Sequence, residues 1–391
     1  MDGVGLVNAL GARWGRELAG GAGQVWTAVG VWPLLGMLAG GADPVVAREL
    51  AVALGLPAEQ APSLAREVIA ALRRVPGCAA ALGLWTADAL AVEPGWAALV
   101  GPSVWGRLSG DLAADQRMLD EWAATETGGL IPELPVRIKP ATLLVLASAV
   151  TVRTRWARAF KPVRLRPGSG PWAGRWLAGL SLEGSELFER IAVAETAAGP
   201  VTEVRVAGDG EVDVHLLLGA PDAPLDTVAA AGFELLAGTA VRVPVAELPD
   251  GAQWPGLALE SVGATRPGDR GALRTVAFEV RADHDLLARP ALFGLETACA
   301  EGGFPGICST TPLRVSQARQ SAMAAFTDAG FEAGAVTVVA MTRSAAMAPP
   351  AVFRVRRAEL RLERPFAFLA VHRPTGLALM AGWVTEPRSA E

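Results

Sequence analysis

The sequence has no tyrosine, only three cysteines and three histidines, and two lysines among its 391 residues. The cysteines, Cys78, Cys299 and Cys308, are odd in number and form no Cys-x-x-Cys pair, which excludes a disulfide framework and a paired-cysteine metal site. This usage is typical of a reducing compartment, and the N-terminus lacks a basic stretch before its first apolar run, so we expect a cytoplasmic protein. Lys139 and Lys161 are the only cations besides arginine and histidine; with the missing tyrosine, this indicates a GC-rich bacterial genome.

Charged side chains are scarce, at 19% of the chain against 51% hydrophobic residues. Such a composition excludes a disordered chain and supplies a large core. The net charge of −5 argues against a nucleic-acid partner, because binding to phosphates usually needs a basic face. The length allows two or three average domains, but no repeat, linker or charge run divides the chain, so we expect one domain over residues 1–391.

One stretch, Ala19–Ala42, carries no charge and is long enough in principle to cross a bilayer. It contains seven glycines, and its strongly apolar part, Val25–Leu38, has only the length of a buried helix with a strand before it. We therefore expect a soluble protein with no membrane partner.

Helical and strand-like patterns alternate irregularly along the chain, which is typical of the α+β class. Leu143–Val152 is apolar, β-branched and uncharged, so it is predicted to be a strand at the centre of a sheet. Asp209-Gly210 between two alternating runs predicts a hairpin over Val201–Leu218, and a second hairpin is predicted from Phe366 to Val384. The predicted helices are Pro44–Leu56, Pro62–Arg74 with Ser63 as its cap, Asp115–Thr127 and Leu286–Glu296, and further extended segments are Ala79–Val92 and Val276–Val280.

Patterns of enzymatic chemistry are missing. The sequence has no Gly-x-Ser-x-Gly, His-Glu-x-x-His, phosphate-binding loop or dinucleotide fingerprint. His215 and His372 lie inside strand-like runs, where a hydrogen-bonded imidazole in the core or at an edge is the usual outcome. His284, between two aspartates, is better explained by a solvated loop than by a metal ligand or an oriented base. We expect no enzyme activity, no cofactor and no metal site.

The stretch from Gly330 to Pro350 changes its character halfway. From Phe331 to Met341 alternate residues form one face that begins with small side chains, as a strand needs if it must slide between two strands that are already packed. Residues 342–348 are small and polar, which predicts an exposed, cleavable loop. An ordinary strand followed by a surface loop would show the same pattern, so this stretch alone leaves both interpretations open.

Several separated motifs, in one order along most of the chain, are similar to those of the serpin family. They are Glu126-Thr-Gly-Gly-Leu-Ile131, Leu143-Leu-Val-Leu-Ala-Ser-Ala-Val-Thr-Val-Arg-Thr-Arg-Trp156 with Phe160, Phe304-Pro-Gly-Ile307, Leu313-Arg-Val-Ser-Gln317, and Arg364-Pro-Phe-Ala-Phe-Leu369 with Thr375-Gly376 and Gly382. The resemblance implies a monomeric, single-domain α+β serpin fold with three β-sheets and eight or nine helices. It also implies a hinge and reactive-centre loop over residues 328–350 and a C-terminal β-hairpin over residues 364–384.

For function, the resemblance implies a suicide inhibitor of a serine protease. The protease would cleave the loop and form an acyl-enzyme, and the freed segment would then insert into the large sheet as a new strand, so the uncleaved fold is metastable. Counted from Gly330, the family's usual hinge length leads to Ser344, whereas side-chain chemistry favours Arg343, one residue earlier, as the anchor for a trypsin-like protease. The expected cleavage site is Arg343–Ser344, and Met347 is a further option for an elastase-like protease. The implied hinge residues are Gly330, Phe331, Glu332, Ala333, Gly334, Ala335 and Thr337, and the residues implied at the point where the sheet opens are Thr27, Gly30, Ser148, Trp156 and Gln320.

The chain also departs from the family pattern. Phe331 stands where the family usually has Thr or Ser, so a bulky ring must be accommodated first and insertion could be slowed. Thr27-Ala28-Val29-Gly30 stands where the family usually has Ser-Pro-x-Ser, and Ser148 and Gln320 stand in place of Asn and His. These changes weaken the polar contacts that hold the sheet closed, although Thr27, Ser148 and Gln320 could bond one another. Slow insertion lets the acyl-enzyme hydrolyse. The alternative is therefore a non-inhibitory, serpin-like binding or structural protein that is cleaved as a plain substrate.

Overall fold

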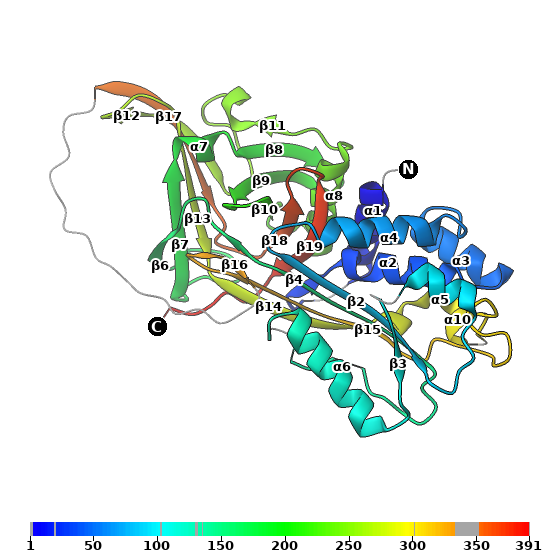
Figure 1. Cartoon of the computed structure of the whole chain (residues 1–391). Helices are drawn as coiled ribbons and strands as arrows, with labels where there is room; N and C mark the ends of the chain where they lie inside the picture. Colours follow the sequence, from blue (N-terminus) through cyan, green and yellow to red (C-terminus); the bar gives the residue numbers. More distant parts are fainter. Residues whose placement is uncertain are drawn as a thin grey trace.

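In the computed structural model, the described part of the chain forms three β-sheets and ten α-helices (Figure 1). The structure describes residues 3–18, 21–101, 104–129, 132–134, 136–300, 302–332 and 352–390. The α+β class and the three sheets agree with the prediction. The ten helices among the described residues exceed the expected eight or nine, because single turns such as α7 (Ser185–Phe188) and α9 (Pro290–Phe293) are included.

The first sheet forms the centre of the hydrophobic core, and every residue of its strands β10, β18 and β19 is buried. Strands β18 and β19 pair in antiparallel register, which confirms the C-terminal hairpin; its turn ends at Gly376, whose φ of +71° favours glycine. Strands β9 and β10 form the other predicted hairpin. The strand order is β1 (Gln24–Trp26), β19 (Leu377–Val384), β18 (Phe366–His372), β10 (Val212–Leu218), β9 (Gly199–Ala207), β8 (Ile191–Thr196) and β11 (Val243–Pro244).

The second sheet is the long one that runs diagonally through Figure 1. Its strand β4 lies between β2 and β15, which confirms the prediction of a central strand at this place. The order is β3 (Trp105–Leu108), β2 (Cys78–Ala87), β4 (Leu144–Val152), β15 (Ala318–Phe326), β16 (Gly330–Glu332) and β5 (Thr154–Arg155), and β14 (Phe278–Asp285) pairs with the other edge of β15.

The third sheet stands at one end of the molecule, beyond the first (Figure 1). Its strand β17 is bonded on both edges, in antiparallel register to β12 and in parallel register to β13. The order is β12 (Leu257–Ala264), β17 (Phe353–Arg361), β13 (Arg270–Val276), β7 (Leu177–Gly184) and β6 (Lys161–Leu165).

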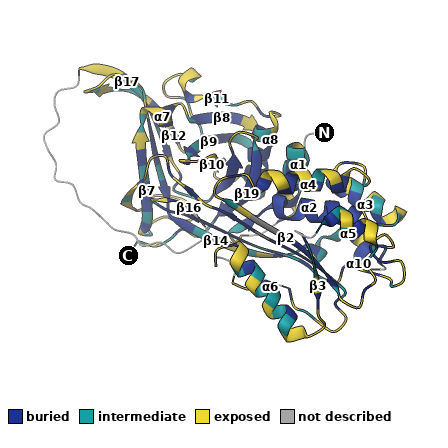
Figure 2. Ribbon diagram, viewed as in Figure 1, coloured by how far each residue is buried: buried dark blue, intermediate teal, exposed yellow. Residues whose placement is uncertain are grey.

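Most helices gather at the opposite end of the long sheet, and α6 crosses one face of that sheet with one side exposed (Figures 1 and 2). Trp85 of β2 packs edge-on against Trp122 of α6, with 4.7 Å between ring centroids, so the helix has its own small core. The remaining helices are α1 (Gly3–Glu17), α2 (Ala28–Ala39), α3 (Pro44–Leu54), α4 (Ala61–Leu72), α5 (Pro94–Val100), α6 (Leu112–Glu126), α8 (Leu225–Ala237) and α10 (Glu296–Ala300), with 3₁₀ turns at Val245–Glu247 and Leu286–Ala288.

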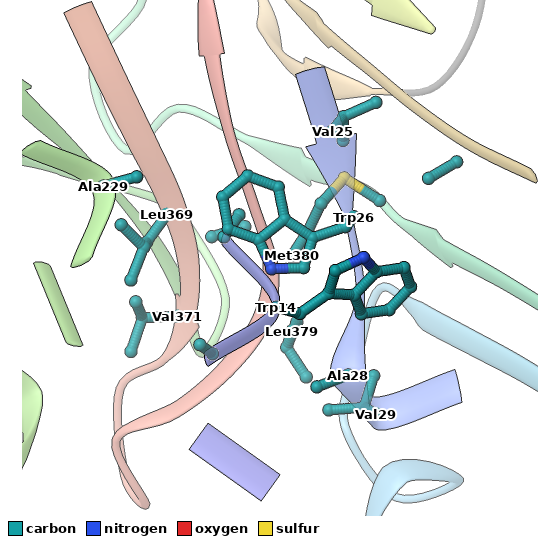
Figure 3. Packing of buried hydrophobic residues seen from close by; sticks show 14 of the residues in the cluster. Trp14, Val25, Trp26, Ala28, Val29, Ala229, Leu369, Val371, Leu379 and Met380 are labelled. Carbon is teal, nitrogen blue, oxygen red and sulfur yellow. The ribbon is translucent and has the colours of Figure 1, made fainter. Parts of the chain in front are cut away.

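Helix α2 explains the uncharged stretch near the N-terminus. All of its residues are buried, and β1 precedes it, as predicted for a core helix that follows a strand. Trp14 of α1, Trp26 of β1 and Met380 of β19 pack around its start (Figure 3). Among the described residues, no helix combines the length and the apolar character that a membrane span requires.

Two local predictions are wrong. Helix α4 has Gln60 rather than Ser63 at its cap position, because the helix already begins at Ala61. The range Leu286–Glu296 is not one helix: Pro290 starts a new turn, and Gly294 ends it in the left-handed region at φ +66°. Strand β14 reaches Asp285, five residues beyond the predicted strand end.

Candidate functional site: the junction of strands β4, β15 and β16

Strands β4 and β15 are paired over only part of their length. Their parallel ladder covers Ala318–Gln320 against Leu146–Ser148, and in the described part of both strands it ends at the pair of Ser148 and Gln320. At the other end, the short β16 lies between β15 and β5, the two-residue strand that follows β4 after Arg153. The long sheet is thus closed at one end and separated by a third strand at the other.

Strand β16 bonds to both of its neighbours in antiparallel register. Phe331 lies opposite Phe326 of β15 on one side and opposite Thr154 of β5 on the other. Gly330 lies opposite Arg155, and a Cβ atom there would come within 2.4 Å of the Thr154 carbonyl oxygen, so only glycine fits this close approach. The first three implied hinge residues are therefore already a strand of this sheet.

The ring of Phe331 is buried, with 1% of its surface exposed. It packs at an angle against Phe368 of the central hairpin, with 6.0 Å between ring centroids. In the uncleaved chain the core thus already accommodates this bulky ring.

Trp156 borders the same end of the sheet. Its indole Nε1 donates to the Thr327 carbonyl oxygen at 2.8 Å, and its backbone N–H donates to Ala329 at 3.1 Å. Its ring lies 4.6 Å from that of Phe326 and 5.8 Å from that of Phe160. Trp156 thereby fixes the turn that leads from β15 into β16.

At the closed end, Gln320 and Thr27 form what we call the latch. The Gln320 amide accepts a hydrogen bond from the Thr27 N–H at 3.0 Å and donates one to the Thr27 carbonyl oxygen at 2.8 Å. The Thr27 hydroxyl donates to the Leu379 carbonyl oxygen at 2.7 Å, so it bonds neither Gln320 nor the start of helix α2. The latch joins β15 to the first residue before α2 and, through Leu379, to the central hairpin.

Ser148, the third residue that could have bonded Thr27 and Gln320, takes a different position. It lies opposite Gln320 across the strand pair and directly above Gly30 of α2. A Cβ atom on Gly30 would come within 2.8 Å of the Ser148 hydroxyl oxygen and 3.1 Å of Val150. Strand β4 therefore rests closely on the glycine surface of α2, while β15 is hydrogen-bonded to the residue before that helix.

His284 is a polar residue of this junction whose location was not predicted from the sequence. It lies in β14 directly opposite Gln320, is buried, bonds the Val25 carbonyl oxygen through Nε2 at 2.8 Å and packs edge-on against Trp14. Burial lowers the pKa of His284. The expectation of a solvated loop is wrong, because the alternation that begins at Phe278 and Val280 continues to His284 and could have indicated a longer strand.

The other two histidines are hydrogen-bonded, as their strand-like surroundings predicted. Nδ1 of His215 lies 2.8 Å from the Glu203 carboxylate, which also accepts from Arg242 at 2.6 Å. His372 bonds the Thr375 hydroxyl at 2.8 Å. Burial opposes ionisation of Glu203, but His215 and Arg242 together hold the pKa of its carboxyl at about 2.

The remaining predicted site residues cannot be placed. Those that lie outside the described residues are Ala333, Gly334, Ala335, Thr337, Arg343, Ser344 and Met347. Of the hinge, the structure describes Gly330 and Phe331, together with the backbone of Glu332.

Comparison with known proteins agrees with this architecture. Residues 278–387 match the family model described as Serpin (serine protease inhibitor). No curated protein matches the chain by sequence. A solved structure described as a thyroxine-binding globulin complex with thyroxine aligns with a TM-score of 0.71 at 16% identity and covers 100% of both chains.

Two further solved structures show the same fold. Cleaved Serpin 42Da aligns with a TM-score of 0.71 at 15% identity over 99% of this chain and 97% of that chain. The thermophilic serpin tengpin, in its native state, aligns with a TM-score of 0.72 at 14% identity over 98% of this chain and 93% of that chain. The chain therefore has the serpin fold, and its segment 278–387 matches the model of the serpin family.

Proposed function

We propose that the chain inhibits a serine protease as a suicide substrate, by inserting its cleaved loop between β4 and β15. The observation that carries the proposal is that β16 already lies between β15 and β5, the short strand that follows β4 after Arg153, while the direct pairing of β4 with β15 covers three residue pairs in the described part of the chain. A sheet built in this way can accept a longer β16 without breaking its edge pairings with β2 and β14.

The two observed registers predict where each inserting residue would lie. If β16 lengthens in register, Ala335 comes to lie between Val150 and Ala322, and Thr337 comes to lie between Ser148 and Gln320. The alanine would thus enter where side chains are small or β-branched. Thr337 would be the first residue whose insertion requires the Ser148–Gln320 pair to separate.

Insertion has a large driving force in this scheme. About a dozen new residues would form about as many backbone hydrogen bonds, each worth about 0.5–1.5 kcal/mol net. The total, on the order of 10 kcal/mol, equals the stability of a whole domain, so the uncleaved chain would be metastable. The chain would act as a substrate that traps its enzyme and would not itself be an enzyme.

Incubation with trypsin tests the proposal. We expect an adduct of chain and protease that survives SDS, with cleavage between Arg343 and Ser344. Ala335→Arg would place a charge among buried residues and should abolish the adduct while leaving cleavage intact. The proposal would be contradicted if the unaltered chain were cleaved cleanly, with no adduct, by every serine protease tested. These proteases would include trypsin and an elastase-like protease that cuts near Met347.

A second candidate function is a non-inhibitory binding protein. A groove of about 310 Å³ lies between α1 and α8, with Phe233 on one wall and the ion pair of Arg16 and Glu234, 3.4 Å apart, at one end. The structurally similar thyroxine-binding globulin binds thyroxine according to its description. A melting temperature that rises with an aromatic carboxylic acid, but not with the same acid after Phe233→Ala, would favour this function.

We also infer that the chain acts as a monomer in the cytoplasm. Cys78, Cys299 and Cys308 are all free thiols, and burial raises the pKa of Cys78 to about 12, which leaves it unreactive. Free thiols persist in reducing compartments. Labelling of all three thiols after denaturation of protein taken directly from cells would test this location.

A further inference from the structure

The outer face of the third sheet carries an ordered array of arginines. Side chains of residues directly opposite one another in neighbouring strands share a face. One row runs from Lys161 of β6 through Ser181 and Arg274 to Arg361 of β17. A second row on the same face, four residues along β17, joins Arg270, Arg357 and Glu260. We refer to Lys161, Arg270, Arg274, Arg357 and Arg361 as the basic face.

A single carboxylate holds this array in place. Glu359 lies between the two rows on β17, and its side chain is only 13% exposed. Its oxygens lie 2.8 Å from Arg361, 3.4 Å from Arg357 and 3.7 Å from Arg274. Three guanidinium groups that converge on one carboxylate leave donors directed outward, because each guanidinium has five N–H groups.

The basic face has a local charge opposite to that of the whole chain. Five cations face three carboxylates, Glu183, Glu260 and Glu359, whereas the chain carries a net charge of −5. The guanidinium-bearing side chains of Arg274, Arg357 and Arg361 are 43%, 36% and 52% exposed. They are therefore both accessible and positioned before any partner arrives.

We propose that the basic face docks an acidic surface of the protease that attacks the neighbouring loop. This inference rests on the proposed function. Strand β17, which lies in this sheet (Figure 1), begins at Phe353, nine residues after Ser344 of the expected cleavage site, so this short length of chain connects a bound protease to the sheet. Val352 and Phe353, 74% and 42% exposed, add an apolar rim where β17 begins. Mixed charge with an excess of arginine suits a protein surface better than a polyphosphate, which would be repelled by the three carboxylates.

The proposal is tested with two natural probes, anionic and cationic trypsin. The measured quantity is the second-order rate at which the intact chain disappears at low ionic strength, whether it ends as an adduct or as a cleaved product. The double variant Arg270→Gln/Arg357→Gln should slow the reaction with anionic trypsin by about 3- to 10-fold, since steering by a charged face acts on association. Glu260→Arg should accelerate it. Both effects should disappear above about 0.5 M salt.

The matched control is Arg48→Gln/Arg66→Gln, which removes the same charge from exposed positions of α3 and α4 at the other end of the molecule. It should leave both rates unchanged. The proposal would be overturned if all variants reacted at equal rates, or if the double variant slowed the reaction with cationic trypsin as much as that with anionic trypsin. It would also be overturned if the double variant lost binding to heparin while neither trypsin rate changed. Because cleavage alone reports the encounter, absence of an adduct would count against the proposed function and not against the docking face.

Discussion

Gly30 of helix α2 lies directly beneath Ser148 of strand β4, so that a methyl group on this glycine would stand 2.8 Å from the serine hydroxyl oxygen. On the neighbouring strand, Gln320 is held by two hydrogen bonds to the residue that precedes the same helix. The two strands that must separate during insertion therefore contact the helix in different ways. Strand β4 packs closely against the helix itself, and β15 is hydrogen-bonded to the residue that precedes it.

Gly30→Ala should destabilise the uncleaved chain by about 1–3 kcal/mol, because overpacking of a buried contact displaces Ser148 and Val150. Urea unfolding followed by tryptophan fluorescence measures this loss. Gly95→Ala is the control, since nothing lies within 4 Å of a Cβ atom at that position. Adding Ser148→Ala to the Gly30 variant should restore part of the loss; a double variant no more stable than Gly30→Ala would show that the contact with Ser148 is not the cause.

Gln320→Leu keeps the volume of the side chain but removes both latch bonds. The buried N–H and C=O of Thr27 would then lack these partners, and each unsatisfied group costs about 1–3 kcal/mol. We expect a lower melting temperature for the uncleaved chain and a much smaller change after loop cleavage. Gln317→Leu is the control and should change neither value, because this glutamine is only half-buried and its two bonds to the Arg137 backbone are exposed to solvent.

The sequence indicated the fold well where local patterns carry it. Leu143–Val152 was uncharged and β-branched and is the central β4, and the uncharged stretch around α2 is a core helix. Local sequence patterns did not predict the structure where contacts between distant segments determine it. Pro290 and Gly294 divide the predicted helix at Leu286–Glu296, and His284 is paired in a strand that the spacing of charges had suggested was a loop.

The candidate site was predicted as a set of positions and not as a geometry. The resemblance to the family identified Thr27 and Gln320, but it could not show that Gln320 bonds the backbone of Thr27. Nor could it show that the Thr27 hydroxyl donates to Leu379, a residue 352 positions away. The burial of Phe331 depends on Phe368 in the C-terminal hairpin. Contacts between segments so far apart in the sequence leave no local periodicity.

Phe331→Ala should release β16 from the sheet. Truncation of a buried Phe typically lowers the free energy of unfolding by about 3–5 kcal/mol. Here the loss cannot exceed the free energy that holds the three-residue β16 in the sheet, because this strand can detach while the rest of the fold remains. A glutamate-specific protease should then cut after Glu332 much faster than in the unaltered chain. The control is Phe353→Ala, at a ring that is 42% exposed. Unchanged cleavage after Glu332 would mean that the ring does not anchor the hinge.

Acid stability should depend on Glu203, the buried carboxylate that His215 and Arg242 share on β9, β10 and the segment before β11. Its pKa is about 2 in the folded chain and close to the ordinary 4.5 when unfolded. A depressed folded pKa stabilises the fold above the unfolded pKa, so this contribution should be complete above about pH 5.5 and decline as the pH falls from there towards 2.

Glu203→Gln should lower the stability at pH 7 and flatten its dependence on pH in that window, because the uncharged amide cannot titrate and leaves Arg242 without its buried partner. Glu195→Gln, on an exposed residue of the adjacent β8, should preserve the slope. A slope that persists in the Glu203 variant would assign the acid sensitivity to other carboxylates.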